Sequence, residues 1–116
     1  MLPAAFRLRR SDDIAMVVRT GLHISTPYVR IHAVLKPDNS HSRLACVVGK
    51  KVHSSAVQRH RYQRWLRVYA EDLLKELKMT YDIVLVGQPS LNTVTTYAQL
   101  KETLQDVSNQ LDKRHL

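Results

Sequence analysis

The spacing of hydrophobic residues changes several times along the chain, and each change predicts a new element. In residues 7–21 the apolar positions recur at intervals of three and four, which predicts a short amphipathic helix. Ser11 can cap its first turn and Gly21 can end it. The predicted apolar stripe, which we expect to be packed in the core, is Ile14, Val17 and Val18.

Residues 28–36 alternate between two faces, which predicts a half-buried strand. One face carries Val29, Ile31, Ala33 and Leu35, and the other carries Tyr28, Arg30, His32, Val34 and Lys36. Residues 37–42 have the composition of a turn, and residues 43–51 form a second apolar run. The two runs together predict an antiparallel hairpin over residues 28–51.

A helical period then extends from Ser54 or Ser55 to Lys78. Its apolar face consists of Tyr62, Leu66, Tyr69, Leu73 and Leu77, and its polar face of His60, Arg64, Arg67, Glu71, Lys75 and Lys78. Residues 81–87 are too few and too β-branched for a helix, so they predict a strand buried on both faces.

The last predicted element is a helix that Thr96 and Gln99 open with a capping box. Its stripe is Leu100, Leu104, Val107 and Leu111, and residues 112–116 are expected to form a frayed tail. The order of elements is helix, two or three strands, helix, strand, helix. This order indicates a single-domain α+β sandwich spanning residues 1–116.

Composition adds a strong charge asymmetry to this picture. The 116 residues carry a net charge of +8, yet residues 1–67 hold 13 Lys/Arg against 3 Asp/Glu. Such a concentration of positive charge favours a polyanionic partner. No apolar run is long enough to cross a membrane, no secretory signal is evident at the N-terminus, and the one cysteine, Cys46, fits a reducing compartment, so we expect a cytoplasmic protein with no membrane partner.

The charge is densest in residues 50–67, which contain six Lys/Arg and two His together with large apolar groups. The four arginines fall within little more than two turns of the predicted helix: Arg59, Arg61, Arg64 and Arg67. Guanidinium groups bind phosphate in a bidentate manner and stack on bases. A rigid basic helix therefore predicts binding to an RNA or DNA backbone, whereas the alternative is a solvated helix whose arginines cover the core.

The same segment, "KKVHSSAVQRHRYQRWLR", resembles the signature of the bacterial ribonuclease P protein component. Its matching positions are Lys50, Lys51, Ala56, Arg59, Arg61, Arg64 and Arg67. Residues 7–21 are similar to the opening segment of that family, with Arg7, Leu8, Arg10, Asp13, Val17 and Gly21 in register. Residues 81–104 resemble its late segment, so the likeness covers most of residues 2–111.

The resemblance implies an αβββαβα sandwich with a left-handed βαβ crossover, a fold shared with a domain of a ribosomal protein. It implies the protein subunit of a ribonucleoprotein that removes the 5′ leader of precursor tRNA. In that family the RNA subunit performs the hydrolysis with Mg²⁺, and the protein binds no cofactor and carries no catalytic residue. The partners implied are the catalytic RNA and the leader.

The resemblance also assigns sites to residues of this chain. The arginine motif for RNA binding is Lys50, Lys51, Arg59, His60, Arg61, Arg64 and Arg67, and Arg7 and Arg10 form an N-terminal basic segment. The candidates for a cleft that holds the single-stranded leader are Ile14, Val18, Tyr28, Arg30 and His32.

Several positions depart from the family pattern. His60 replaces an asparagine, Gln63 a lysine and Gln88 an arginine, while the first helix and the strand lack the usual aromatic residues of the cleft. Because stacking contributes about 1–3 kcal/mol per base, we expect leader binding to be weaker and to depend more on Arg30 and His32.

Two other functions stay open from the residues themselves. A ribosomal or general RNA-binding module could share this sandwich and its basic helix. An autonomous metal-dependent nuclease is less favoured, because the six histidines are scattered and the acids of the first half are only Asp12, Asp13 and Asp38.

Overall fold

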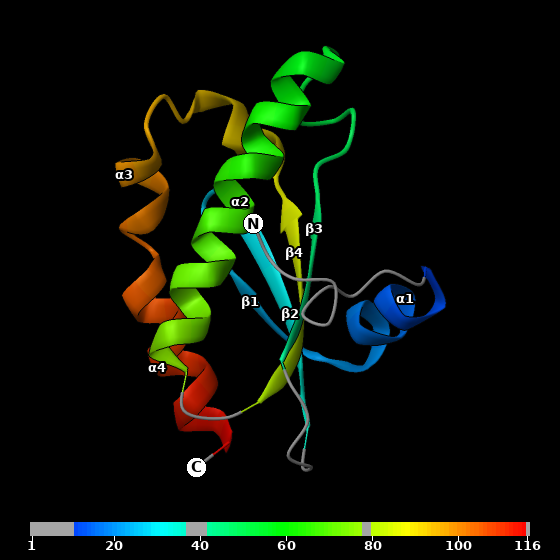
Figure 1. Ribbon diagram of the computed structural model, residues 1–116, viewed down its shortest axis with the longest axis vertical. Helices are drawn as coiled ribbons and strands as arrows, with labels where there is room; N and C mark the ends of the chain where they lie inside the picture. The colour runs from blue at the N-terminus through cyan, green and yellow to red at the C-terminus, as the bar shows by residue number, and fades with distance from the viewer. Residues whose placement is uncertain (1–10, 37–41, 78–79, 116) are drawn as a thin grey trace.

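The computed structural model describes residues 11–36, 42–77 and 80–115, so Arg7, Arg10 and Lys78 lie outside the described residues. In chain order the elements are α1 (Ser11–Thr20), β1 (Leu22–Ser25), β2 (Val29–Leu35), β3 (Arg43–Val47), α2 (Ala56–Glu76), β4 (Tyr81–Gly87), the 3₁₀ helix η2 (Pro89–Thr93), α3 (Tyr97–Lys101) and α4 (Leu104–His115). They form the predicted α+β sandwich, with helices on both faces of one sheet (Figure 1).

The predicted hairpin over residues 28–51 is wrong. The strand order is β1-β2-β4-β3, so β4 separates β2 from β3. β2 pairs antiparallel with β1 on one side and with β4 on the other, and β3 pairs parallel with β4. The apolar strand β4, buried over residues 81–85, gains a neighbour on each edge in this order. The local hairpin is instead β1–β2, whose turn is closed by reciprocal hydrogen bonds between Thr26 and Val29.

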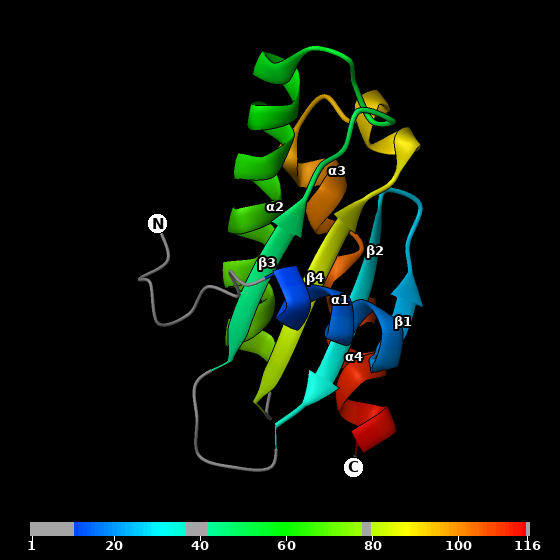
Figure 2. The ribbon, with the colours of Figure 1, turned by 90° about the vertical axis from the view of Figure 1, so that its right-hand side faces the viewer.

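The connection from β3 through α2 to β4 is a left-handed crossover. In Figure 2, α1 lies in front of the sheet and α2 behind it, and β4 stands to the right of β3 with both strands pointing upward. A chain that rises along β3, descends behind the sheet and rises again to the right turns in the left-handed sense. Parallel crossovers are right-handed in nearly all sheets, so only the family resemblance, and no general rule, predicted this hand.

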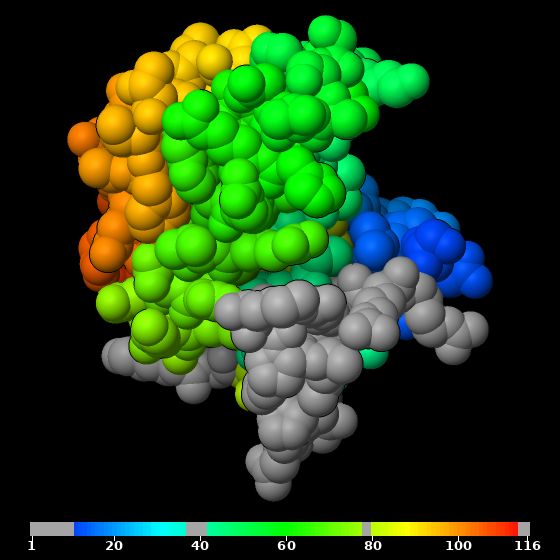
Figure 3. All heavy atoms as spheres, turned by 45° about the horizontal axis from the view of Figure 1, so that its top comes forward, coloured from blue at the N-terminus to red at the C-terminus, as the bar shows by residue number. Residues whose placement is uncertain are grey.

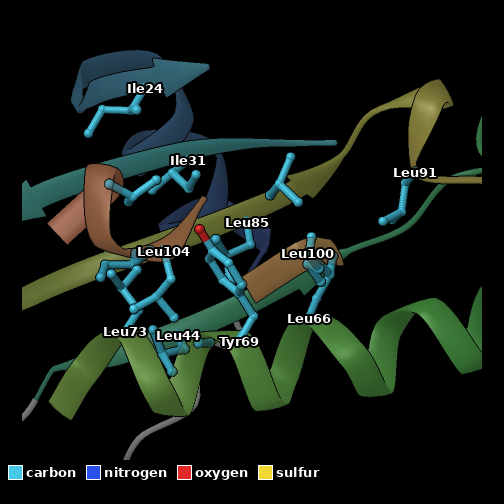
Figure 4. Close-up of a cluster of buried hydrophobic side chains, with 14 of the residues drawn as sticks. Ile24, Ile31, Leu44, Leu66, Tyr69, Leu73, Leu85, Leu91, Leu100 and Leu104 are labelled. Carbon is cyan, nitrogen blue, oxygen red and sulfur yellow. The ribbon is translucent and has the colours of Figure 1, made fainter. Parts of the chain in front are cut away.

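The larger core lies between the sheet and the layer of α2, α3 and α4. The predicted apolar face of α2 is buried from Tyr62 to Leu73, and Leu77 packs against the same cluster. Figure 4 shows Leu66 of α2 beside Leu100 of α3, and Leu73 of α2 beside Leu104 of α4. This packing fixes α2 from Tyr62 to Leu77, the part of the helix that carries Arg64 and Arg67.

The predicted C-terminal helix is divided into α3 and α4. The division falls at Glu102 and Thr103, where the Thr103 hydroxyl donates to the carbonyl of Leu100 and also bonds the Tyr69 hydroxyl at 2.9 Å. A threonine hydroxyl that bonds a nearby carbonyl competes with a regular helical backbone. The predicted stripe is nevertheless buried at every position. The expected frayed tail of residues 112–116 is wrong over 112–115, because α4 continues through His115, and residue 116 lies outside the described residues.

Among the described residues, the opposite face of the sheet carries α1 alone. Val17 of α1 and Val84 of β4 are fully buried there, and Ile14, Val34, Ala45 and Val86 pack around them. The helix ends at Gly21, whose N–H donates to the carbonyl of Val17 at 2.9 Å. A Cβ at Gly21 would lie 2.6 Å from that carbonyl oxygen and 2.8 Å from the carbonyl oxygen of Ala33. The close contact between α1 and β2 therefore requires glycine.

Gly21→Ala is expected to lower the free energy of unfolding by about 1–2 kcal/mol, because both atoms in the way belong to the backbone and cannot rotate aside. Urea denaturation measures this change. Gly49→Ala is the matched control, because nothing lies within 4 Å of a Cβ there. Equal stability of the two variants would contradict the close approach of α1 to the sheet.

Candidate nucleic-acid interface

The N-terminal half of α2 presents an array of cations on its surface. His60, Arg61, Arg64 and Arg67 are exposed, and Arg59 is half-buried. Within residues 11–36, 42–77 and 80–115, no carboxylate oxygen lies within 4.0 Å of these guanidinium groups. The ion pairs of that part of the chain lie elsewhere, at Asp82 with Lys36 and Arg43, and at Asp72 with Lys101. The exposed arginines Arg61, Arg64 and Arg67 can therefore meet an external anion.

The loop before α2 is fixed to the helix by hydrogen bonds. The Ser55 side chain accepts from the Gln58 N–H as the N-cap, and the Ser55 N–H donates to Nδ1 of His53. The Arg59 guanidinium donates to the carbonyls of His53 and Ser54 at 3.1 and 3.0 Å. Arg59, predicted as an RNA contact, thus also holds the loop in place.

A second set of bonds ties this end of α2 to the rest of the fold. The Tyr62 hydroxyl donates to the carbonyl of Asn92, and the Asn92 side-chain amide donates to the carbonyl of Val52. Lys50 and Lys51 are exposed in the same loop. Figure 3 shows the loop and the N-terminal half of α2 (green) as one continuous outer surface beside η2 (yellow). The predicted arginine motif is therefore a preorganised surface on a capped and anchored helix.

A second candidate surface lies on the α1 side of the sheet. The strand register places four residues in one row across all four strands: Ser25, Arg30, Val86 and Val47. Ser25 and Arg30 are exposed, and Val47 is 39% exposed. Figure 3 shows the molecular outline hollowed between α1 (blue) and the loop that precedes α2. We call this row the sheet lane. It places one cation beside apolar groups, a combination that suits the binding of single-stranded nucleic acid.

The predicted cleft residues do not all meet at this lane. Ile14 is partly buried in the α1 core, as expected, but Val18 is 39% exposed and is not a core residue. Tyr28 precedes β2 and packs against the core on the α2 side. Its predicted place on one face with Arg30 and His32 is wrong, because the alternation of the strand begins only at Val29. Whether any of them touches RNA stays a prediction.

His32 is more buried than its strand position predicted. It is 7% exposed, lies opposite His23 across β1 and β2 with ring centroids 6.0 Å apart, and its Nδ1 has no hydrogen-bond partner among the described residues. Burial, followed by the charges of His23 and Arg30, lowers the pKa of His32. The imidazole is therefore held neutral beside the lane, and Arg30 is the cation of the row.

Cys46 offers no reactive group at this site. Burial raises the pKa of its thiol to about 12, although the nearby charge of Arg67 acts in the opposite direction. At neutral pH the side chain is a protonated thiol against the core, as expected for a small hydrophobe.

Known proteins share both the sequence and the fold. The family model described as "Ribonuclease P" matches residues 2–112. A "Ribonuclease P protein component" of Pseudanabaena is 34% identical, covering 97% of this chain and 94% of its own, and one of Mycolicibacterium paratuberculosis is 38% identical, covering 90% of each. This chain belongs to the ribonuclease P protein family.

Solved structures of ribonuclease P proteins have the same fold. The Staphylococcus aureus protein superposes with a TM-score of 0.77 at 19% identity, covering 94% of this chain and 96% of its own. The Thermotoga maritima protein gives a TM-score of 0.76 at 21% identity, covering 90% and 96%. At these identities the likeness establishes the αβββαβα architecture.

One feature of the sheet lane was not found from the sequence. Val47 and Val86 join Arg30 in one row only through the register of three strands, which local periodicity does not contain.

No helix in the described part of the chain is long and apolar enough to cross a membrane. In those same residues no group of three or more His, Cys, Asp or Glu side chains is placed to hold a metal ion.

The buried histidine gives a stability prediction. Since the pKa of His32 is lowered in the folded protein, the unfolded chain takes up a proton first as the pH falls through its ordinary value of 6.5. The free energy of unfolding should therefore be fully retained above pH 6.5 and decline below it. It should level off once the pH is below the pKa that His32 has in the folded protein. Urea denaturation at neutral and at mildly acidic pH measures this decline as a difference between two unfolding midpoints. In the His32→Gln variant the two midpoints should be nearly equal. His23→Gln is the control and should keep most of the decline, because burial of His32 is the main cause.

Proposed function

We propose that this protein is the protein subunit of ribonuclease P. The arginine surface of α2 binds the folded catalytic RNA, and the sheet lane holds the single-stranded 5′ leader of precursor tRNA. The observation that carries the proposal is the set of exposed guanidinium groups on an anchored helix, with no carboxylate close to them among the described residues.

The chemistry of these groups suits positioning, and the reaction itself is assigned to the RNA. Phosphate groups of the two RNAs repel one another when a precursor docks on the catalytic RNA. Cations held on a rigid protein surface offset this repulsion without the entropy cost of ordering free ions. The RNA subunit, with its Mg²⁺ ions, then hydrolyses the phosphodiester bond at the end of the leader, and the protein lowers the Mg²⁺ concentration that the complex needs.

Reconstitution tests this function. Adding the protein to its cognate catalytic RNA should allow precursor-tRNA cleavage at a Mg²⁺ concentration where the RNA alone is inactive. The protein should also bind a precursor with a leader more tightly than mature tRNA within the complex, and Arg30→Gln should reduce that difference. Unchanged cleavage at low Mg²⁺ would contradict the proposal and favour a general RNA-binding module.

A parallel incubation addresses the remaining alternative. An autonomous nuclease would cleave RNA when the purified protein and Mg²⁺ are present without the catalytic RNA, and EDTA would stop it. The proposed function predicts no cleavage in that incubation.

A further inference from the structure

We propose that Arg61 and Trp65 form a stacking site for one unpaired nucleobase, separate from the face of α2 that contacts phosphates. The proposal rests on the proposed function in one respect, that a folded RNA lies against α2. It adds a contact of a different chemical kind, directed at a base and not at the backbone.

The geometry of the pair is the first step. Cζ of Arg61 lies 4.8 Å from the ring centroid of Trp65, within the range of a cation–π contact. The Trp65 ring meets the Tyr62 ring edge-on, with centroids 5.8 Å apart and an interplanar angle of 68°. Tyr62 is 6% exposed, and its hydroxyl donates to the carbonyl of Asn92. The indole is therefore held in place from the core side, and the guanidinium lies over it.

The position on the helix is the second step. At about 100° per residue, Trp65 and Arg67 are separated by roughly 200° around α2 and lie on opposite flanks. Arg64 lies between these flanks on the outer face. The Arg61–Trp65 pair therefore does not share the flank of Arg67, whose charge is felt by Cys46 of β3. An RNA that covers the outer face of α2 reaches both flanks but meets different groups on each.

The chemistry of the pair is the third step. Arg61 is exposed, Trp65 is half-buried, and no carboxylate in the part of the chain that the structure describes lies within 4.0 Å of the Arg61 guanidinium. A guanidinium is planar and stacks on nucleobases as well as on aromatic rings. With the indole on one side, its other face is available to a base. An unpaired nucleotide offers a free base face, whereas the bases inside a double helix are already stacked on both faces.

The alternative is that the aliphatic stem of Arg61 only shields the indole from water. That alternative predicts no difference between an RNA and any other polyanion. Because Trp65 is the one tryptophan of the 116 residues, its fluorescence reports directly on this site. The full chain can therefore be titrated with the catalytic RNA and, separately, with sodium polyphosphate, which carries charge but no bases.

The proposal predicts that the RNA quenches Trp65 emission and that polyphosphate, at equal saturation, does not. Trp65→Leu should weaken RNA binding roughly tenfold, the loss expected for one stacked base, and leave both the salt dependence and the polyphosphate affinity unchanged. Trp65→Phe should restore part of the loss. An unchanged affinity for polyphosphate would show that the Trp65→Leu variant still presents its arginines on a folded helix. A misfolded variant would instead lose affinity for polyphosphate as well as for RNA.

Three results would overturn the stacking site. They are equal emission changes with RNA and polyphosphate, equal RNA affinity of wild type and Trp65→Leu, and an equal loss of affinity for both ligands in that variant. In each case RNA still binds, so the proposed function survives. If the wild-type protein bound polyphosphate but not the catalytic RNA, the proposed function itself would fail and the stacking site with it.

Discussion

Replacing Arg64 and Arg67 together with alanine is expected to weaken binding of the catalytic RNA roughly 100-fold, because each charge-assisted contact to phosphate contributes about 1.5 kcal/mol. Both side chains are exposed on the outer part of α2, away from its buried face, so their removal should leave the fold intact. Fluorescence anisotropy of labelled RNA over a series of salt concentrations measures the loss.

The salt dependence separates a specific interface from general attraction. Each phosphate that a cation neutralises contributes about 0.7–0.9 to the slope of log affinity against log salt, so the double variant should have a slope shallower by roughly 1.5–2. Lys101→Ala with Lys113→Ala is the matched control, since it removes two positive charges from α3 and α4. If both double variants lost affinity equally, net charge and not the α2 surface would govern binding.

The sequence predicted this surface because its signals are local. The period of α2 reports which face is buried, and the positions of the arginines relative to that period place them outside. The same holds for β4, whose continuous apolar run requires cover on both faces. Capping by Ser55 is another local signal, since the acceptor and the N–H that it binds are three residues apart.

Pairing between strands could not be predicted in the same way. Neighbouring strands in sequence usually pair, and that preference produced the wrong hairpin of residues 28–51. The observed order depends on β4, which is made from residues that follow α2, and on the left-handed crossover that inserts it between β2 and β3. Nothing in the residues of β2 and β3 alone records this insertion.

The sheet lane was predicted only in part for the same reason. Arg30 was found because it alternates with the buried residues of β2. Tyr28 was misplaced because the alternation was extended beyond the strand into the turn at Thr26. Val47 was missed because its row depends on the parallel register of β3 with β4. Residues that reach a site through tertiary register leave no pattern in the sequence.

Leu66→Ala is expected to lower the free energy of unfolding by about 3 kcal/mol, because it removes a fully buried side chain between α2 and the sheet and leaves a cavity. Val68→Ala on the same helix is the control: Val68 is 43% exposed, and the change should be within about 0.5 kcal/mol. Urea denaturation of both variants gives the comparison.

The consequence for RNA binding follows from where Leu66 lies, between Arg64 and Arg67 on the chain but on the buried face of the helix. Both variants keep every arginine, so without urea their affinity for the catalytic RNA should equal that of the wild type. With increasing urea the affinity of Leu66→Ala should fall first, at the concentration where α2 unfolds, and saturating RNA should shift that midpoint upward. If the unfolded chain bound the RNA as tightly as the folded one, the arginines would act as a flexible basic segment. The buried face of α2 would then have no part in recognition.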